Sequence, residues 1–551
     1  MGLEHNSELS AGLPTMAPSF GKSPPSTLPS SSFLQSQSDD LPALSSAESS
    51  SSPSSSSSCT TSPSLTSTQL RTLLASSMSS MYRTEVPLYG DLLSIISTVN
   101  SSIISRDPTL ISDDEISRLS VERHGAIRVG TASELTLLSR IFRIFGMHPV
   151  GYYDLWKDAR LPIHATAFRP VTAQGLLKNP FRVFCSLLRM HLIANPSTRR
   201  LAEELLGKRK IVSTRCIELL HKAEESTVGS EGEVNGLTRD EAVEFVECVV
   251  PIFAWHPTSP ATVDEYDRLA KTHPLVADIV SFRGPHINHL TPRTLDIDAV
   301  QRAMVEQGMD AKDVVEGPPK RDWAVLLRQT SFHALSEAVV FDGEVEGKHK
   351  ARFGEIEARG MALTRKGARL YDELMVKVGE VKREMETSGE RVDKEQCGGI
   401  LEKVFRDGFP DTRDALLRQG LGWWAFEVRD ARKAKAMWQD RKENVCGWLA
   451  DLVDAGALDA EPITYEDFLP ASAAGIFQSN LPQATQSQAG EAMAEVDEAE
   501  ARKRLELAVG GIILDYSTLY SEQQRQSLVE VGEVLRVDVD EIVEAIERQC
   551  A

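Results

Sequence analysis

The sequence predicts an α+β fold in which one β-α-β-β-β module occurs twice. In each half of the chain a short apolar strand precedes a helical segment, and three more strand-like runs follow that helix. Glycine, proline or asparagine residues separate the runs. Two copies of one supersecondary unit in a single chain are an internal repeat. Paired modules of this kind face their sheets toward each other and form a half-barrel cup, with large helical insertions expected elsewhere.

The first module is expected at 123–194. Its first strand is RHGAIRVG, and the helix TASELTLLSRIFRIFG follows it directly. Thr131 and Glu134 have the spacing of a capping box, which predicts the start of that helix. The three strand-like runs lie at 148–155, 161–171 and 181–189.

The second module is expected at 283–364. Its first strand, HINHLTPRTL, precedes a helix at 296–308 that Asp296 or Asp298 can cap. Strand-like runs follow at 314–319, 323–335 and 351–363. Each first strand also contains a His-x-x-x-Arg pattern, and this shared placement supports the repeat. The two patterns are His124 with Arg128 and His289 with Arg293.

The other parts of the chain differ in composition from the two modules. The Ser/Pro-rich head cannot bury enough apolar surface to offset its ordering entropy, so it is expected to be disordered. The remaining segments have helical periodicity. The expected divisions are the head at 1–68, N-terminal helices at 69–122, a helical insertion at 195–282, a helical region at 365–510 and a helical tail at 511–551.

Composition excludes several classes of protein. The formal net charge of -20 argues against nucleic acid as a partner, because phosphate-binding proteins carry a basic patch or stripe. No apolar run of 18 residues occurs, so no membrane span is expected. The seven cysteines form no CxxC pair, which is typical of reduced thiols. Since the first residues also lack the pattern of a secretory or mitochondrial address, a cytoplasmic location is expected.

A metal centre is predicted where the two modules meet. Ligands in such a cup come from the first strand of each module and the last strand of the second. Those places hold His124, His289 and either Glu355 or Glu357, since residues i and i+2 of a strand share a face. His286 competes with His289, which is preferred because it matches the His-x-x-x-Arg placement. Two imidazoles and one carboxylate leave open positions that suit non-haem Fe(II), whereas zinc would favour activation of water.

Most of the twelve histidines are expected to have no part in this centre. His5, His221 and His349 lie in polar or disordered stretches and are set aside as candidate ligands. Four others can act only by orienting a ligand through the second ring nitrogen. These are His164, His256, His273 and His333.

Four motifs carry a resemblance to a known family. They are HGAIR, GPHINHLTPRTLDID, FGEIEARG and YEDFLPASAAGIFQSNL, and they occur in this order between about 85 and 510. In these motifs the chain resembles the 2-oxoadipate dioxygenase/decarboxylase family, iron(II) enzymes of lysine breakdown with a vicinal-oxygen-chelate-like fold. The head and the last helix lie outside the resemblance.

The resemblance implies a ligand set, a substrate and a reaction. His124, His289 and Glu357 take the iron-ligand positions, and Arg128 takes that of the catalytic arginine that holds a substrate carboxylate. Ala471 and Ser472 fall in a loop that touches the substrate. The implied partners are a small 2-oxo dicarboxylic acid and dioxygen, which Fe(II) chemistry converts to 2-hydroxyglutarate and carbon dioxide. Family members more often have valine where this chain has Ala471.

Two other functions stay open at this point. The same scaffold supports other metal-dependent reactions, such as those of an isomerase, a lyase or a different 2-oxo acid oxygenase, because a fold does not fix chemistry. A non-catalytic binding module is the third possibility. Motifs of serine hydrolases and phosphate-binding loops, GxSxG and GxxxxGK[ST], do not occur.

Overall fold

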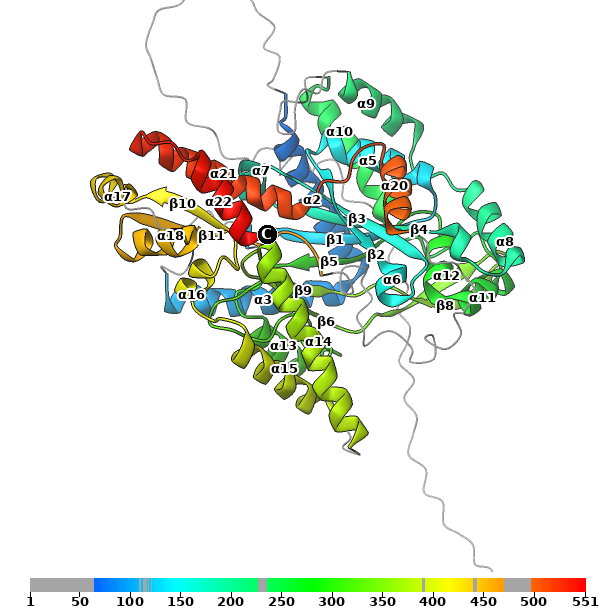
Figure 1. Cartoon of the computed structure of the whole chain (residues 1–551). Helices are drawn as coiled ribbons and strands as arrows, with labels where there is room; N and C mark the ends of the chain where they lie inside the picture. The colour runs from blue at the N-terminus through cyan, green and yellow to red at the C-terminus, as the bar shows by residue number, and fades with distance from the viewer. Residues whose placement is uncertain are drawn as a thin grey trace, which may run out of the picture. The chain divides into compact units, whose positions relative to one another are not determined.

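A five-stranded sheet positions the residues of the predicted metal centre. Its strand order is β2-β3-β4-β1-β5, and it lies near the middle of Figure 1. The strands are β1 Glu122–Val129, β2 His148–Asp154, β3 Ile163–Arg169, β4 Arg182–Leu188 and β5 Ile287–Pro292. The computed structural model describes residues 64–108, 111, 116, 118, 119, 121–225, 234, 236–388, 392–439, 443–469 and 497–551. The expected Ser/Pro-rich head therefore lies outside the described residues up to position 63.

The first predicted module is present in this sheet. β1 runs parallel to β4, while β3 pairs antiparallel with both β4 and β2. Helix α5 (Ala132–Ile144) connects β1 to β2 and begins with the predicted capping box. The Thr131 hydroxyl accepts a hydrogen bond from the Glu134 N–H at 3.2 Å, and the Glu134 carboxylate accepts one from the Thr131 N–H at 3.2 Å. These two bonds satisfy N–H groups that a helix start leaves without partners.

The second module continues from β5, which pairs antiparallel with β1. Helix α13 (Ile297–Glu306) follows β5, and Asp296, not Asp298, caps it by accepting from the Ala299 N–H at 2.9 Å. Strands β6 (Leu327–Ser331) and β9 (Glu355–Arg359) pair antiparallel. Two isolated bridges complete the module by joining residue 293 to residue 357 and residue 316 to residue 329. The predicted α+β fold with paired β-α-β-β-β modules is confirmed.

A hairpin that the sequence analysis did not predict is inserted between β6 and β9. It consists of β7 (Ser336–Phe341) and β8 (Val345–Lys350). The sequence of β8 is VEGKHK, in which only His349 is buried. A strand with so few apolar residues lacks the alternation on which strand prediction depends.

Helices surround the sheet and fill the segment between the two modules, with α8 to α12 in the stretch from 196 to 280 (Figure 1). The helices not yet given are α2 Ser67–Glu85, α3 Pro87–Arg106, α6 Leu155–Ala159, α7 Ala173–Lys178, α8 Pro196–Gly207, α9 Thr214–Glu224, α10 Arg239–Val249, α11 Val263–Thr272, α12 Pro274–Val280, α14 Arg365–Thr387, α15 Lys394–Gly408, α16 Arg413–Arg418, α17 Ala431–Trp438, α18 Val445–Asp454, α20 Glu498–Val509, α21 Tyr516–Leu535 and α22 Asp540–Cys550, with 3₁₀ helices at Met190–Leu192 and Val250–Phe253.

The segment expected to be helical after residue 365 also contains a two-stranded antiparallel sheet. Its strands are β10 (Trp424–Val428) and β11 (Leu458–Pro462). Helix α21 covers the free edge of β10, since side chains of α21 accept hydrogen bonds from the strand's backbone. Gln524 accepts from the Trp424 N–H at 2.8 Å, and Ser527 accepts from the Phe426 N–H at 3.0 Å. Covering a sheet edge in this way prevents pairing with another chain.

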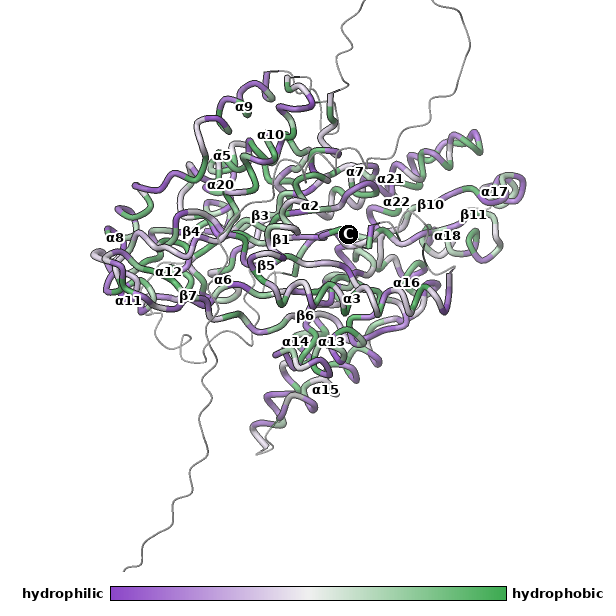
Figure 2. Tube along the Cα trace, turned by 180° about the vertical axis from the view of Figure 1, so that it is seen from behind, coloured by the Kyte–Doolittle hydropathy of each residue, from purple (hydrophilic) through white to green (hydrophobic). Residues whose placement is uncertain are grey.

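Among the described residues, no helix is both long enough and apolar enough to cross a bilayer. Hydrophilic residues recur along outer helices such as α15 and α17 (Figure 2). The main apolar core lies instead between α2, α5, α10 and the sheet. Tyr82 of α2 reaches from this core toward β5 and the residues just before β9, with its hydroxyl 2.9 Å from the Asn288 carbonyl and 2.8 Å from the Phe353 carbonyl.

Candidate metal centre

Two histidines from neighbouring strands lie face to edge at the junction of the modules. His124 is in β1 and His289 is in β5, where the antiparallel register pairs Ala126 with His289. Their ring centroids are 5.5 Å apart and the ring planes are nearly perpendicular. Both side chains are buried, with exposures of 1% and 0%. The structure therefore brings together the two histidines that the repeat singled out.

Glu355, in β9, completes a group of three potential ligands. Its Oε1 atom is 2.9 Å from His124 Nε2 and 3.8 Å from His289 Nε2. One donor atom from each of the three residues lies within 4.8 Å of the others. Thr291 and Gln329 donate hydrogen bonds to the same Oε1 atom at 3.1 and 2.6 Å, which holds the carboxylate in place.

Glu357, the ligand implied by the family resemblance, lies at the other nitrogen of His124. Its Oε2 atom is 2.8 Å from His124 Nδ1. Arg359 binds both of its oxygens, through Nε at 2.6 Å and Nη2 at 2.9 Å. The strand does place both glutamates on one face, as expected, but the imidazole of His124 lies between them. Among the described residues the donor group thus contains Glu355 rather than Glu357.

Burial and neighbouring charges shift the pKa values in this group. Burial acts to lower the pKa of His124, but hydrogen bonds with Glu355 and Glu357 outweigh it and raise the pKa, so a metal ion must displace a proton from this ring. Burial lowers the pKa of His289 to about 4, so its imidazole is neutral near neutral pH and keeps a lone pair. Burial acts to raise the pKa of Glu355, but His289 and a hydrogen bond from His124 outweigh it and lower the pKa. Burial likewise opposes ionisation of Glu357, and the Arg359 guanidinium brings its pKa well below the ordinary value. Both carboxylates are therefore anionic.

The hydrogen-bonding state of His289 tests whether a metal fits. Neither ring nitrogen of this fully buried histidine has a hydrogen-bond partner among the described residues, and neither does Glu355 Oε2. Buried polar atoms without partners are costly in free energy and need an explanation. A metal ion held by His124, His289 and Glu355 would provide a partner for one ring nitrogen of His289 and for the Glu355 carboxylate. Two imidazoles and a carboxylate are also the donor set that suits Fe(II) with open positions.

Two phenyl rings cover the group. Phe353 stacks on His289 with a centroid distance of 4.8 Å, and Phe468 meets the edge of His124 at the same distance. Apolar rings beside a metal exclude water and lower the local dielectric. Phe468 belongs to the segment 463–469, where the described chain ends before resuming at 497. The predicted substrate-contacting residues Ala471 and Ser472 lie outside the described residues.

A cluster of ionic contacts fixes the segment that carries Phe468. Asp467 is fully buried, and Arg169 of β3 binds its two carboxylate oxygens at 2.9 and 3.0 Å. The hydroxyl of Tyr520, in α21, donates to Asp467 and accepts from the Glu466 N–H at 2.7 Å. Residues from β3 and from the C-terminal helices therefore hold the wall of the metal centre.

Arg128, the predicted carboxylate-binding residue, lies four positions after His124 in β1. It is buried, with 9% exposure, and its Nη1 atom donates to Asp278 Oδ2 at 2.6 Å. Asp278 belongs to a second buried group of potential metal donors, with His286 and His349. His286, the alternative to His289 as a predicted ligand, therefore belongs to this second group and not to the first.

Asp278 was not among the predicted site residues, and His349 was set aside as a candidate ligand, yet both belong to this second group. His349 has an exposure of only 4%. A signal existed for Asp278, since it is the one charged residue of the apolar helix PLVADIV. In β8, the period-two alternation of a strand places His349 on the same side as Val345 and Gly347, but the neighbouring lysines obscure it.

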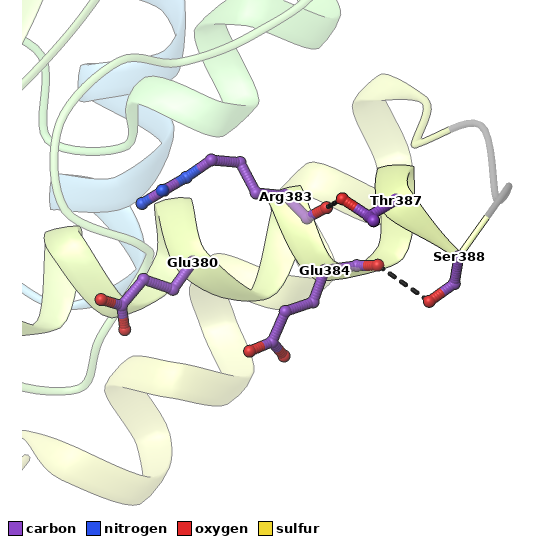
Figure 3. Close-up of a pocket in the computed structure, with 5 residues that line it drawn as sticks. All are labelled: Glu380, Arg383, Glu384, Thr387 and Ser388. Carbon is purple, nitrogen blue, oxygen red and sulfur yellow. Dashed lines mark hydrogen bonds between the residues drawn. The ribbon is translucent and has the colours of Figure 1, made fainter.

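A surface pocket at the end of α14 has none of these features. Five exposed residues line it, and Figure 3 shows them along one helix end. The hydroxyls of Thr387 and Ser388 donate to the carbonyls of Arg383 and Glu384 at 2.7 and 2.9 Å. Such bonds to the preceding helical turn are ordinary for these residue types. The lining residues are Glu380, Arg383, Glu384, Thr387 and Ser388.

Comparison with known proteins identifies the family. The family model described as 2-oxoadipate dioxygenase/decarboxylase matches residues 74–480, most of the chain. The chain belongs to this family. The 2-oxoadipate dioxygenase/decarboxylase of Escherichia coli is 44% identical over 471 residues, covering 84% of this chain and 98% of the relative. The protein of the same name from Pseudomonas putida is 43% identical over 478 residues, covering 85% and 97%.

Solved structures of the family agree with this assignment. The hydroxyglutarate synthase from Pseudomonas putida, solved in complex with 2-oxoadipate, has a TM-score of 0.72 and 41% sequence identity. That match covers 86% of this chain and 100% of the other chain. An uncharacterised protein from Shigella flexneri has a TM-score of 0.70 and 40% identity, and the match covers 85% of this chain and 99% of that chain. The paired modules of the chain are therefore those of the 2-oxoadipate dioxygenase/decarboxylase family.

Proposed function

We propose that the chain is an Fe(II)-dependent dioxygenase that converts 2-oxoadipate and dioxygen into 2-hydroxyglutarate and carbon dioxide. The buried group of His124, His289 and Glu355 carries this proposal, because both ring nitrogens of His289 lack hydrogen-bond partners among the described residues in a member of the 2-oxoadipate dioxygenase/decarboxylase family. The relative from Pseudomonas putida was solved with 2-oxoadipate bound, which supports the choice of substrate. The atoms of this reaction balance without a second 2-oxo acid.

Glu355 is proposed as the carboxylate ligand, and Glu357 as the group that orients His124. The support is geometric: Glu355 faces the Nε2 atoms of both histidines, whereas Glu357 binds Nδ1 of His124 alone. A carboxylate on the second ring nitrogen fixes the tautomer of a ligand histidine and makes the imidazole a stronger donor. Glu357 has this position, and Arg359 holds it there.

The protein's own residues bind and orient the substrate. Fe(II) would supply the site for chelation of the 2-oxo acid and for activation of dioxygen. Arg128 is proposed to hold a substrate carboxylate through a charge-assisted, bidentate pair. His124 and Arg128 lie on the same face of β1, about 13 Å apart along the strand, a span that the diacid and the long arginine side chain bridge together. Phe353 and Phe468 exclude water from the histidine side.

The proposed setting is lysine breakdown in the cytoplasm. The described cysteines are free thiols, which is typical of a reducing compartment and supports this location. The lysine pathway follows from the family resemblance and from the six-carbon substrate.

An anaerobic reconstitution tests the proposal. Metal-free protein loaded with Fe(II) is expected to bind one equivalent per chain and, on addition of 2-oxoadipate and dioxygen, to form 2-hydroxyglutarate and carbon dioxide in equal amounts. Mass spectrometry of the products and an oxygen electrode measure this. His124→Ala is expected to abolish metal retention and turnover. Full activity with zinc and no oxygen uptake would show instead that the scaffold performs another metal-dependent reaction.

A further inference from the structure

Asp278 is the centre of a buried hydrogen-bond network outside the metal group. One carboxylate oxygen, Oδ2, accepts from Arg128 Nη1 at 2.6 Å. The other, Oδ1, is 2.8 Å from His349 Nε2 and 3.3 Å from His286 Nε2. Asp278, His286 and His349 have exposures of 5%, 5% and 4%. A carboxylate with both oxygens occupied in this way has little freedom to rotate.

A second row of contacts fixes His349 in turn. The hydroxyl of Tyr266, in α11, is 2.9 Å from His349 Nδ1. Trp255 stacks on the His349 ring with an interplanar angle of 10°, and its ring also meets the edge of His286 at 4.8 Å. If Tyr266 donates to Nδ1, then Nε2 carries the proton and donates to Asp278. The chain of contacts therefore runs from α11 through β8 and α12 to Arg128 in β1.

The charges in this network are balanced without a metal ion. Burial acts to raise the pKa of Asp278, but the Arg128 guanidinium and the two histidines bring it well below the ordinary value. The carboxylate is therefore anionic beside a permanently charged guanidinium. The same guanidinium would repel a divalent cation placed between Asp278 and the histidines. The arrangement fits a support for Arg128 better than a second metal site.

We propose that Asp278, held by His349, is a positioning residue that fixes the guanidinium of Arg128 and thereby selects 2-oxo diacids by chain length. This inference rests on the proposed function, in which Arg128 binds the substrate carboxylate. Asp278 binds Nη1 of the guanidinium, so the orientation of the guanidinium plane is set by the network and not by the substrate. A terminal carboxylate can then be paired at one distance from the metal only.

The variant Asp278→Asn tests this inference because it keeps the shape of the side chain and removes its charge. The KM for 2-oxoadipate is expected to rise about ten- to a hundredfold, the range for one charge-assisted hydrogen bond, while kcat changes much less. The preference in kcat/KM for the six-carbon diacid over 2-oxoglutarate and 2-oxopimelate is expected to fall about tenfold. Iron content is expected to stay at one equivalent per chain.

A double-mutant cycle and a matched control separate positioning from general stability. In the Arg128→Ala background, Asp278→Asn is expected to change kcat/KM little, since its effect passes through Arg128. Asp154→Asn is the control, because the Arg189–Asp154 pair is also buried, with an N–O distance of 2.9 Å, and involves neither Arg128 nor the metal group. This control is expected to lower stability and to leave the chain-length preference unchanged.

Variants at His349 keep the test decisive if Asp278→Asn fails to fold. His349→Gln keeps a donor near the position of Nε2 and is expected to retain most of the chain-length preference, whereas His349→Leu is expected to lose it. If the wild type is active and both Asp278→Asn and His349→Leu keep the chain-length preference, the inference is wrong while the proposed function stands. If the wild type binds a second equivalent of metal and Asp278→Asn does not, the cluster is a metal site and the inference is wrong. No turnover of 2-oxoadipate by the wild type would overturn the proposed function, and the inference with it.

Discussion

The variants Glu355→Gln and Glu357→Gln are expected to differ in what they lose: the first loses mainly iron binding, and the second loses mainly stability. Glu355 accepts hydrogen bonds from the uncharged side chains of Thr291 and Gln329, so Glu355→Gln is expected to remove the proposed metal ligand with little change in the surrounding structure. The metal-free Glu355→Gln protein is expected to lose about 1–2 kcal/mol of unfolding free energy, or less, because a buried charge disappears as well. Iron retention is expected to be abolished.

For Glu357→Gln the loss of stability is expected to be larger than for Glu355→Gln, and the loss of iron affinity smaller. Glu357 binds both donors of the buried Arg359 fork, whose side chain is 1% exposed, and glutamine leaves that guanidinium without a negative charge. Breaking a buried ion pair on one side costs about 3–5 kcal/mol. Iron affinity is expected to fall about ten- to a hundredfold, as for other groups that orient a ligand histidine.

Two measurements on each variant check this pair of expectations. Metal-free proteins are unfolded by denaturant, and Fe(II) affinity is then measured anaerobically by titration. The wild type and Gln329→Ala, which removes a donor to Glu355 but no ligand, serve as references. If Glu357→Gln loses iron completely at unchanged stability while Glu355→Gln still binds it, the ligand roles are the opposite of those proposed.

Three further expectations concern Arg128, the acid range and the end of β9. Arg128→Ala is expected to lower kcat/KM for 2-oxoadipate about a hundredfold or more at unchanged iron content, and a normal kcat/KM would exclude its role in substrate binding. Burial lowers the pKa of His164 to about 3, below that of an unfolded histidine, so stability is fully present above pH 6.5 and is lost as the pH falls toward 3. In His164→Gln, unfolding free energies between pH 6 and 4 are expected to fall less steeply, by about 1.4 kcal/mol per pH unit, and an unchanged slope would contradict the assigned pKa. Gly360→Ala would place a Cβ atom 2.3 Å from the Ala324 backbone, so a loss of about 2 kcal/mol or more of unfolding free energy is expected. Gly379→Ala, in the open part of α14, is expected to add about 0.5–1 kcal/mol. Equal unfolding free energies for the two variants would refute this reasoning.

Local features of the chain were predictable because their causes are local. The capping box of Thr131 and Glu134 needs only residues three positions apart, and the structure has both of its hydrogen bonds. Asp296 caps α13 for the same reason. The His-x-x-x-Arg repeat located His124 and His289, since the pseudo-symmetric pairing of β1 and β5 brings equivalent positions together. The two helix caps thus depend on local residues alone, and the two histidines were found because the repeat is visible in the sequence.

Features that depend on distant contacts were not predictable from spacing. Glu355 and Glu357 lie on one face of β9, so their spacing does not distinguish their roles. They differ in which ring nitrogen of His124 they contact, and these contacts span 231 and 233 residues of the chain. Asp278 and His349 are 71 residues apart and meet only through the fold. The pairing of β10 with β11 also involves distant residues, because side chains of α21 accept hydrogen bonds from the backbone of β10.

The contact of Tyr520 with Asp467 has a consequence for how the enzyme is made. The ribosome releases β1, β5 and β9 long before α21, yet the wall that carries Phe468 is secured only when residue 520 has emerged. At typical elongation rates of about 5–20 residues per second, His124 precedes its last supporting helix by tens of seconds. A nascent chain therefore holds all three proposed ligands before the wall that carries Phe468 is secured, and a chain truncated before residue 520 is expected to fold its sheet but to retain iron less well than the full chain.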